Sequence, residues 1–289
     1  MLQATLRAVA RLPLPWLHRI GAVAGWLVYR VAPRYAARLT DNLAASGLAD
    51  DPVRFEQICG TAVCEMGKGL FELPAIWFRP TEDAAALVIE AHGWHLVDEA
   101  RRQGRGILFL TPHLGCFEVS ALYAALRIPI TVLYRPPKLK WLEPLMRAGR
   151  NRGYGRLAPT SFGGVRQLLK ALKAGEAVGL LPDHVPGFGD GVWADFFGRP
   201  AYTMTLAGKL QRATNCAVFL AAARRLPAGK GYALTIEALD ADLGGPDGPR
   251  MLNAAIEQLV RQCPEQYLWS YNRYKVPAGA EPPIAGGSR

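Results

Sequence analysis

Short apolar runs alternate with amphipathic segments over most of this chain. The apolar runs have the length of strands and are predicted as strands at Leu87–Ala91, Ile107–Leu110, Ile130–Leu133, Ala177–Leu181, Val218–Ala222 and Ala233–Glu237. The amphipathic segments are predicted as helices at His95–Gln103, Cys116–Leu126, Lys140–Arg150, Gly164–Ala174, Met204–Arg212 and Arg250–Gln262. This alternation is typical of an α/β fold in which helices flank a mainly parallel, mixed sheet.

The N-terminal part of the chain has a different pattern. Leu12–Ala32 is apolar but is interrupted by His18 and Arg19, so its unbroken core, Ile20–Tyr29, is shorter than the ~20 residues that a helix needs to span a bilayer. Aromatic and basic residues accompany this core, namely Arg7, Arg11, Trp16, Trp26, Arg30, Arg34 and Arg38. They favour an interfacial helix. Residues 1–40 are therefore predicted to be a membrane-anchoring helical segment, and a buried N-terminal helix is the alternative.

The remainder of the chain is predicted to form one domain and a tail. Val53–Trp77 is predicted as one long helical stretch, ended by Pro74. Residues 41–275 contain no internal repeat and no linker of the kind that separates domains. Residues 276–289 are rich in Pro, Gly and Ala and are predicted to be disordered.

Charge and cysteine content narrow the partners and the compartment. The sequence has 34 Lys and Arg against 24 Asp and Glu, a net charge of +10, which favours anionic lipids or anionic carrier molecules. Nucleic acid is disfavoured, because no zinc-knuckle spacing or aromatic–glycine signature accompanies the basic residues. The 5 cysteines include no CxxC pair and no metal-ligand spacing, so a reducing compartment is indicated and no metal is expected.

The stretch from Ile107 to Glu118 carries the strongest chemical signal. Pro112 ends the apolar strand and places His113 in the turn, so that Glu118 falls in the first turn of the next helix. In that arrangement the carboxylate can reach one imidazole nitrogen and raise the basicity of the other, which makes a general base. The alternative is a helix-capping His and a Glu favoured by the helix dipole. Cys116 is interpreted as a buried packing residue, with an acyl-accepting nucleophile as the alternative.

Further polar residues follow other predicted strands. Arg135 comes directly after a strand, and Arg147, Arg150 and Arg152 cluster downstream, where guanidinium groups could clamp phosphates. Asp183, with His184 beside it, ends another buried strand, where α/β sheets gather functional residues. The aromatic segment from Trp193 to Pro200 is interpreted as the wall of a pocket for a hydrocarbon chain, or else as a core strand.

These motifs together resemble a known family. In chain order they are a strand followed by His113-x4-Glu118, YRP at 134–136, Arg150 in an arginine-rich helix end, GLLPD at 179–183, FFGRPA at 196–201 and PEQYLWSYNRYK at 264–275. The ordered set resembles the lipid A late acyltransferases of Gram-negative bacteria, the lauroyl/myristoyl acyltransferase family within the glycerolipid acyltransferase superfamily. The likeness runs from the N-terminal anchor to Lys275.

The resemblance implies an acyltransferase with a His113/Glu118 dyad. His113 would deprotonate a hydroxyl of a lipid-linked 3-hydroxyacyl chain, which would attack the thioester of an acyl carrier protein or of coenzyme A without a covalent acyl-enzyme. Backbone N–H groups at the helix start after His113, or a nearby arginine, would stabilise the oxyanion. Arg135, Arg150, Arg152 and Asp183 are the expected substrate-binding residues. No metal or cofactor is implied.

The resemblance also implies a place in the cell and leaves some alternatives open. The expected location is the cytoplasmic face of the inner membrane, with an anionic lipid acceptor. The family pattern differs at Cys116, at His184 and Val185 after Asp183, and at Tyr271-Asn272-Arg273, which leaves acceptor and chain length open. The alternatives are acyl transfer to another glycolipid, an ornithine-type lipid or a lysophospholipid, or a catalytically silent lipid-binding member.

Overall fold

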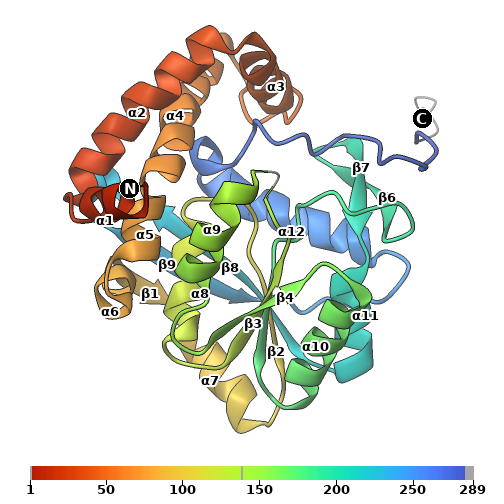
Figure 1. Cartoon of the computed structure of the whole chain (residues 1–289). Coiled ribbons are helices and arrows are strands. Elements are labelled where there is room, and N and C mark those ends of the chain that lie inside the picture. Colours follow the sequence, from red (N-terminus) through yellow and green to blue (C-terminus); the bar gives the residue numbers. More distant parts are fainter. Residues whose placement is uncertain (1, 138, 284–289) are drawn as a thin grey trace.

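A seven-stranded sheet in the order β1-β9-β8-β2-β5-β3-β4 forms the centre of the computed structural model, which describes residues 2–137 and 139–283 (Figure 1). Its strands are β1 (Val88–His92), β2 (Ile107–Leu110), β3 (Ile130–Tyr134), β4 (Gly155–Pro159), β5 (Ala177–Leu180), β8 (Ala217–Arg225) and β9 (Tyr232–Ala238). Neighbouring strands are parallel except β8 and β9, which are antiparallel. The predicted mainly parallel, mixed sheet is confirmed.

Helices cover both faces of this sheet because successive residues of its central strand point to opposite sides. Leu108 and Leu110 pack in one apolar cluster, whereas Ile107 and Phe109 pack in the other. The first cluster includes residues of α10 (Phe162–Lys173), α11 (Leu206–Thr214) and α12 (Gly248–Gln262), and the second includes residues of α7 (Trp94–Arg102) and α8 (Phe117–Ala125). The segment 140–150 forms a short 3-10 turn, η1 (Lys140–Leu142), and α9 (Glu143–Arg150). Two further 3-10 turns are η2 (Pro227–Gly229) and η3 (Pro264–Gln266).

A separate two-stranded hairpin contains the aromatic segment. It consists of β6 (Gly191–Phe196) and β7 (Arg199–Met204), joined by Phe197 and Gly198. Both linking residues have positive φ, 49° and 69°, as the tight turns that suit the twist of a hairpin require. The hairpin packs on α12 rather than joining the main sheet.

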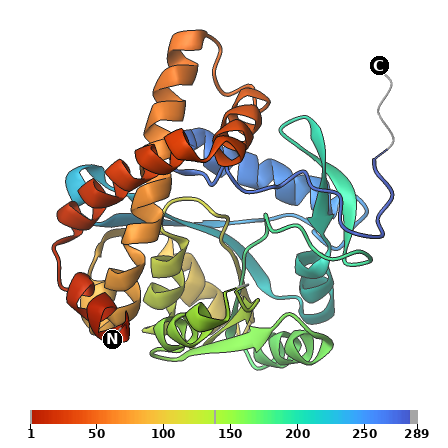
Figure 2. The same cartoon turned by 45° about the horizontal axis from the view of Figure 1, so that its top comes forward.

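The N-terminal third is helical and lies against the sheet domain. It comprises α1 (Leu2–Ala10), α2 (Leu14–Val31), α3 (Pro33–Ala44), α4 (Pro52–Phe71), α5 (Leu73–Phe78) and α6 (Thr81–Ala85). The single long helix predicted over 53–77 is wrong, because Glu72 ends α4 and Pro74, which cannot donate a backbone hydrogen bond, stands in the first turn of α5. In Figure 2, α2 lies across α4 on the outside of the molecule.

The contact between α2 and α4 is made by glycines. A Cβ atom on Gly67 of α4 would lie 1.9 Å from the carbonyl oxygen of Gly21 of α2, so only glycine permits this approach. The opposite side of α2 carries large apolar side chains in solvent, among them Trp16, Val23 and Trp26. Helix α2 is thus buried on one face and exposed on the other. Within residues 2–137 and 139–283, no helix combines the length and the apolar character that crossing a membrane requires.

The C-terminal segment contacts both the N-terminal helices and the β6–β7 hairpin. Asn42 of α3 donates through Nδ2 to the carbonyl oxygens of Trp269 and Tyr271, at 2.8 and 3.1 Å. Beyond it, Trp193 of the hairpin donates to the carbonyl oxygen of Glu281. The disorder predicted for 276–289 stays a prediction, and residues 284–289 lie outside the described residues.

Candidate active site

His113 and Asp183 meet at the carboxyl edge of the sheet. They follow β2 and β5, which are parallel neighbours, so both residues emerge at the same edge. Asp183 Oδ1 lies 2.9 Å from His113 Nδ1, and the backbone N–H of His113 donates to Asp183 Oδ2 at 3.0 Å. Burial alone would raise the pKa of Asp183, but these contacts hold that pKa well below its usual range. An ionised carboxylate only accepts hydrogen bonds, so the neutral form of the imidazole carries its proton on Nδ1 and its lone pair on Nε2.

Glu118 does not make the contact that the sequence predicts. Its carboxylate accepts from Trp77 Nε1 at 3.0 Å and forms an ion pair with Arg150, whose Nε lies 3.0 Å from both oxygens. The expected contact between Glu118 and His113 is therefore corrected, because Asp183 occupies the imidazole nitrogen. Between them the chain turns at Gly115, which has a φ of +59°, and the first turn of α8 then presents Glu118 to α5 and α9.

The second nitrogen of His113 faces another imidazole. His184 Nε2 lies 3.1 Å from His113 Nε2, and the rings are nearly parallel, with centroids 4.6 Å apart. Tyr271 stacks against both rings. Burial lowers the pKa of His184 to about 4, so His184 is neutral at pH 7. Because Nε2 of His113 holds the lone pair, His184 is the donor in this contact.

Of the three arginines expected to bind substrate, Arg150 and Arg135 lie near the site and Arg152 does not. Arg150 lies in the site beside Glu118, and although burial lowers its pKa, the carboxylate outweighs burial and the pKa is raised. Arg135 is exposed, and its charge is among the causes that lower the pKa of His184. Arg152 is not brought into the site: its guanidinium donates to the carbonyl oxygens of Ile76 and Arg79 and to Thr81.

The thiol of Cys116 is packed rather than presented. It is 2% exposed, and burial raises its pKa well above the ordinary value of 9.0. A thiol in this environment stays protonated and is a poor nucleophile. This geometry favours the interpretation of Cys116 as a packing residue.

The backbone N–H groups of the loop after β2 already donate hydrogen bonds within the protein. The N–H of His113 donates to Asp183, and those of residues 114, 115 and 116 donate to carbonyl oxygens of Pro112, Gln266 and Ala223. These four groups are therefore not available to an oxyanion, and the donors expected at the helix start or on a nearby arginine stay a prediction.

An apolar cavity opens beside the Glu118–Arg150 pair. It encloses about 930 Å³, the open solvent at its mouth included, and its wall includes Trp94, Phe109, Leu122, Ile130, Leu234 and Ile236. Thr111 and Phe117, which flank His113 in sequence, also line it. The segment 193–200, interpreted as a pocket wall, contributes no residue to this cavity and forms the β6–β7 hairpin instead. The apolar wall of the cavity lies next to the Glu118–Arg150 pair.

Comparison with known proteins decides the family. The family model described as "Bacterial lipid A biosynthesis acyltransferase" matches residues 1–276. The chain belongs to this family. It is similar to the lipid A biosynthesis lauroyltransferase of Escherichia coli (strain K12), with 28% identity over 275 residues, 93% of this chain and 88% of that protein. The lipid A biosynthesis palmitoleoyltransferase of the same organism is 26% identical over 271 residues, covering 92% and 87%. A lipid A biosynthesis acyltransferase of Haemophilus influenzae is 27% identical over 284 residues, covering 94% and 88%.

Some residues of this acyltransferase site were not found from the sequence. Trp77 lies 41 positions before Glu118, and Tyr271 lies far beyond His113, so no spacing rule connects either of them to its partner. His184 was noticed beside Asp183, but its contact with His113 was not predicted. Its position directly after a strand that ends at the same sheet edge was the available signal.

Proposed function

We propose that the protein moves a fatty acyl group from an acyl thioester to a hydroxyl group of a lipid A precursor. The donor would be an acyl carrier protein or coenzyme A, both anionic, and the positive net charge of the chain suits them. The observation that carries the proposal is the His113–Asp183 pair beside an apolar cavity. A base of this kind activates a hydroxyl, and a cavity of this kind holds the chain that is transferred.

His113 acts as general base in this proposal. Asp183 holds the proton on Nδ1, so Nε2 accepts the proton of the acceptor hydroxyl, and the oxygen attacks the thioester carbon. The carbon–sulfur bond then breaks, and the imidazolium returns the proton to the departing thiolate. The acceptor hydroxyl must replace the His184 N–H on Nε2, so acceptor binding displaces His184.

Glu118 supports the reaction through Arg150 rather than through His113. The carboxylate uses Nε and Nη2 of Arg150 and thereby fixes the guanidinium in the lining of the cavity. Nη1 is the nitrogen that we assign to the oxygen of the reacting carbonyl or to an acceptor phosphate. Arg135, exposed and close enough to lower the pKa of His184, is assigned to the acceptor phosphates.

The acceptor is a membrane lipid, and we propose that the exposed face of α2 rests on the cytoplasmic surface of the inner membrane. Trp16, Val23 and Trp26 are 57%, 60% and 47% exposed, and the guanidinium carbon of Arg30 lies 4.7 Å from the centroid of the Trp26 ring. Aromatic rings beside cations are suited to the headgroup layer of an anionic membrane. The free cysteines suit the reducing side of that membrane.

Transfer to defined acceptors tests the proposal. Purified protein is incubated with acyl carrier protein or coenzyme A thioesters and with one of three acceptors: a lipid A precursor that carries 3-hydroxyacyl chains, an ornithine-type lipid or a lysophospholipid. Mass spectrometry is expected to find the added acyl group on the lipid A precursor and to find none with His113→Ala. If only the ornithine-type lipid or only the lysophospholipid is acylated, the substrate belongs to that lipid class and the lipid A assignment is wrong. Lipid binding without transfer to any acceptor would show a catalytically silent member.

A further inference from the structure

A cluster of buried charges contacts the loop after β2 from the end of β8. Arg225, the last residue of β8, donates through Nε and Nη2 to the two carboxylate oxygens of Glu72, at 2.9 and 2.6 Å. Glu65 of α4 lies 3.4 Å from Arg225 Nη1 and also pairs with Lys68. The side chains of Arg225 and Glu72 are 4% and 1% exposed. Burial alone would raise the pKa of Glu72, but Arg225 and His18 lower it to about 2.

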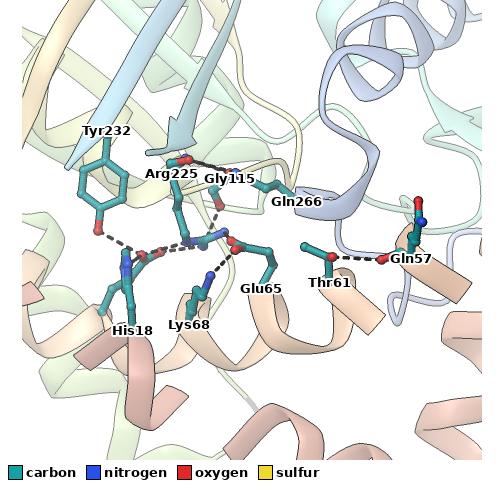
Figure 3. Close-up of polar contacts among 10 residues, drawn as sticks. His18, Gln57, Thr61, Glu65, Lys68, Gly115, Arg225, Tyr232 and Gln266 are labelled. Carbon is teal, nitrogen blue, oxygen red and sulfur yellow. Dashed lines mark hydrogen bonds and ion pairs between the residues drawn. The ribbon is translucent and has the colours of Figure 1, made fainter. Parts of the chain in front are cut away.

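The guanidinium of Arg225 also holds the backbone of the active-site loop. Its Nη2 lies 3.0 Å from the carbonyl oxygen of Gly115, between His113 and Glu118 in sequence (Figure 3). The N–H of Gly115 donates to the carbonyl oxygen of Gln266 at 3.0 Å, and the amide side chain of Gln266 is bonded to both backbone groups of Arg225, at 2.8 and 3.0 Å. Both polar groups of Gly115 are therefore fixed by Arg225 and its direct partner.

Position 115 requires glycine. Its φ is +59°, and a Cβ atom there would lie 2.1 Å from the carbonyl oxygen of Ala223, so a residue with a side chain would clash with β8. The polar contacts of Gly115 with Arg225 and Gln266 hold it in this conformation. The orientation of this peptide sets the direction in which the chain leaves His113 and enters α8. A shift of Gly115 would therefore move His113 and Glu118 relative to each other.

The same cluster reaches the outer helix α2. Glu72 lies at the joint between α4 and α5 and accepts from His18 Nε2 at 3.0 Å and from the hydroxyl of Tyr232 at 2.9 Å. His18 is on α2, Tyr232 is on β9 and Arg225 is on β8. The carboxylate of Glu72 thus contacts residues of α2, β8 and β9. Arg225, which this carboxylate holds, in turn bonds the carbonyl oxygen of Gly115.

We propose that Arg225, held by Glu72 and His18, is a positioning residue for acyl transfer. It fixes the carbonyl of Gly115 and thereby the position of His113 relative to Glu118, which is paired with Arg150. Because His18 of α2 helps to hold Glu72, the packing of α2 against the sheet domain is also needed to keep these side chains in their places. The role rests on the proposed function of His113 as the base. Apolar residues could fill this space with comparable stability, so the charge cluster is expected to serve alignment of the site.

Conservative variants test this role without leaving a bare buried charge. Arg225→Lys keeps the charge but cannot bond both oxygens of Glu72 and the carbonyl of Gly115 at once. His18→Ala removes one donor to Glu72, and His18→Gln restores an N–H. Asn253→Ala is the control: its buried amide donates to Ala194, Asp195 and Thr203 and accepts from Arg273, and none of these contacts involves residues 113–116, so its loss destabilises the fold by another route.

The kinetic readout separates positioning from folding. Each variant is assayed well below its own unfolding temperature. Arg225→Lys and His18→Ala are expected to lower kcat about tenfold or more with KM for both substrates nearly unchanged, because displaced groups lose rate rather than binding. His18→Gln is expected to recover most of kcat, and Asn253→Ala to keep it. An unchanged kcat in Arg225→Lys, or an equal loss in Asn253→Ala, would overturn the proposal.

Hydrogen exchange tests the same role without any activity. The amide protons of His113, Gly115 and Cys116 are all bonded in the loop, and those of β2 lie in the neighbouring ladder. In Arg225→Lys the loop amides are expected to exchange about tenfold faster while β2 keeps its protection. If loop and strand amides change together, Arg225 has only a structural role. If the loop amides respond but the wild-type protein transfers no acyl group, the proposed function fails and the positioning of the loop stands.

Discussion

The carboxylate of Asp183 holds Nδ1 of His113 from a neighbouring strand, with 2.9 Å between the two atoms. A second hydrogen bond runs from the backbone N–H of His113 to the same carboxylate, so both the ring and the main chain are fixed by one residue. This arrangement is the geometry of an oriented base, in which the carboxylate selects the tautomer and stabilises the imidazolium that forms.

Replacing the orienting carboxylate should reduce the rate more than the binding of substrates. Asp183→Asn is expected to lower kcat about a hundredfold or more, because the amide no longer enforces the Nδ1–H tautomer. Asp190→Asn changes a carboxylate on the loop that follows and is expected to leave kcat near the wild-type value. Steady-state kinetics of the two variants check this. A wild-type kcat in Asp183→Asn would show that Asp183 does not orient the base.

A buried, protonated thiol predicts direct transfer. Cys116→Ala is expected to keep most of the activity and to destabilise the protein by about 1 kcal/mol, the usual scale for loss of a small buried group. Denaturant unfolding gives the second quantity. Mass spectrometry of the protein quenched during turnover should find no acyl group on Cys116, and an acylated Cys116 would contradict transfer without an acyl-enzyme.

Narrowing the apolar cavity should change the preferred chain length. Ala121 lines the cavity from α8, so Ala121→Leu is expected to shift use toward shorter acyl donors, with kcat/KM falling about tenfold for each methylene displaced. Ser120→Ala is the matched change on the same helix. The Ser120 hydroxyl is buried with no hydrogen-bond partner among the described residues, so its removal should not lower stability. Competition between donors of graded length decides the matter, and an unaltered preference in Ala121→Leu would place the chain elsewhere.

The exposed face of α2 should control binding to vesicles. The double variant Val23→Ser, Trp26→Ser is expected to weaken binding to anionic vesicles about tenfold or more, because two apolar side chains leave the headgroup layer. Phe162→Ser removes a side chain that is 80% exposed on α10 and should leave vesicle binding unchanged. Co-sedimentation with vesicles at low and high salt measures the binding of both variants. An equal loss of vesicle binding in the two variants would indicate non-specific binding of exposed apolar side chains rather than a role of α2.

The lowered pKa of His184 predicts a loss of stability in mild acid. Its pKa is about 4 in the folded protein against an ordinary 6.5, so between these values the unfolded chain binds more protons. The free energy of unfolding therefore falls as pH drops through this window. His184→Gln should show a shallower fall in urea titrations between pH 6.5 and 4.5, above the range in which Glu72 begins to lose its stabilising charge. An unchanged slope would contradict the assignment of His184 as the neutral, buried partner of His113.

The sheet and one half of the candidate site could be predicted from local patterns. The apolar runs Ile107–Leu110 and Ala177–Leu181 predict β2 and β5, the second of which ends one residue earlier, at Leu180. Strand ends of a parallel sheet meet at one edge, which brings His113 and Asp183 together. Strand β4 was missed because Gly155 and Arg156 interrupt its apolar character at the sheet edge.

The direction of Glu118 could not be predicted in the same way. A spacing of five residues fixes a direction only inside one regular element, and Gly115 turns the chain within this interval. The partners that Glu118 finds, Trp77 and Arg150, come from helices whose packing is decided by tertiary contacts. For the same reason the broken helix at Glu72 follows from a buried ion cluster as well as from Pro74.

The hydrogen bonds from Asn42 to Trp269 and Tyr271 have a consequence for the order in which the protein is made. Helices α2 and α3 are synthesised before the segment 266–271, in which Asn42, Gly115 and Arg225 all find partners. Folding along the growing chain therefore completes these contacts only after residues 266–271 have emerged. Under the proposed membrane role of α2, its aromatic face would be available to a lipid surface before the loop after β2 is held in place, so a nascent chain would bind that surface before it could transfer an acyl group.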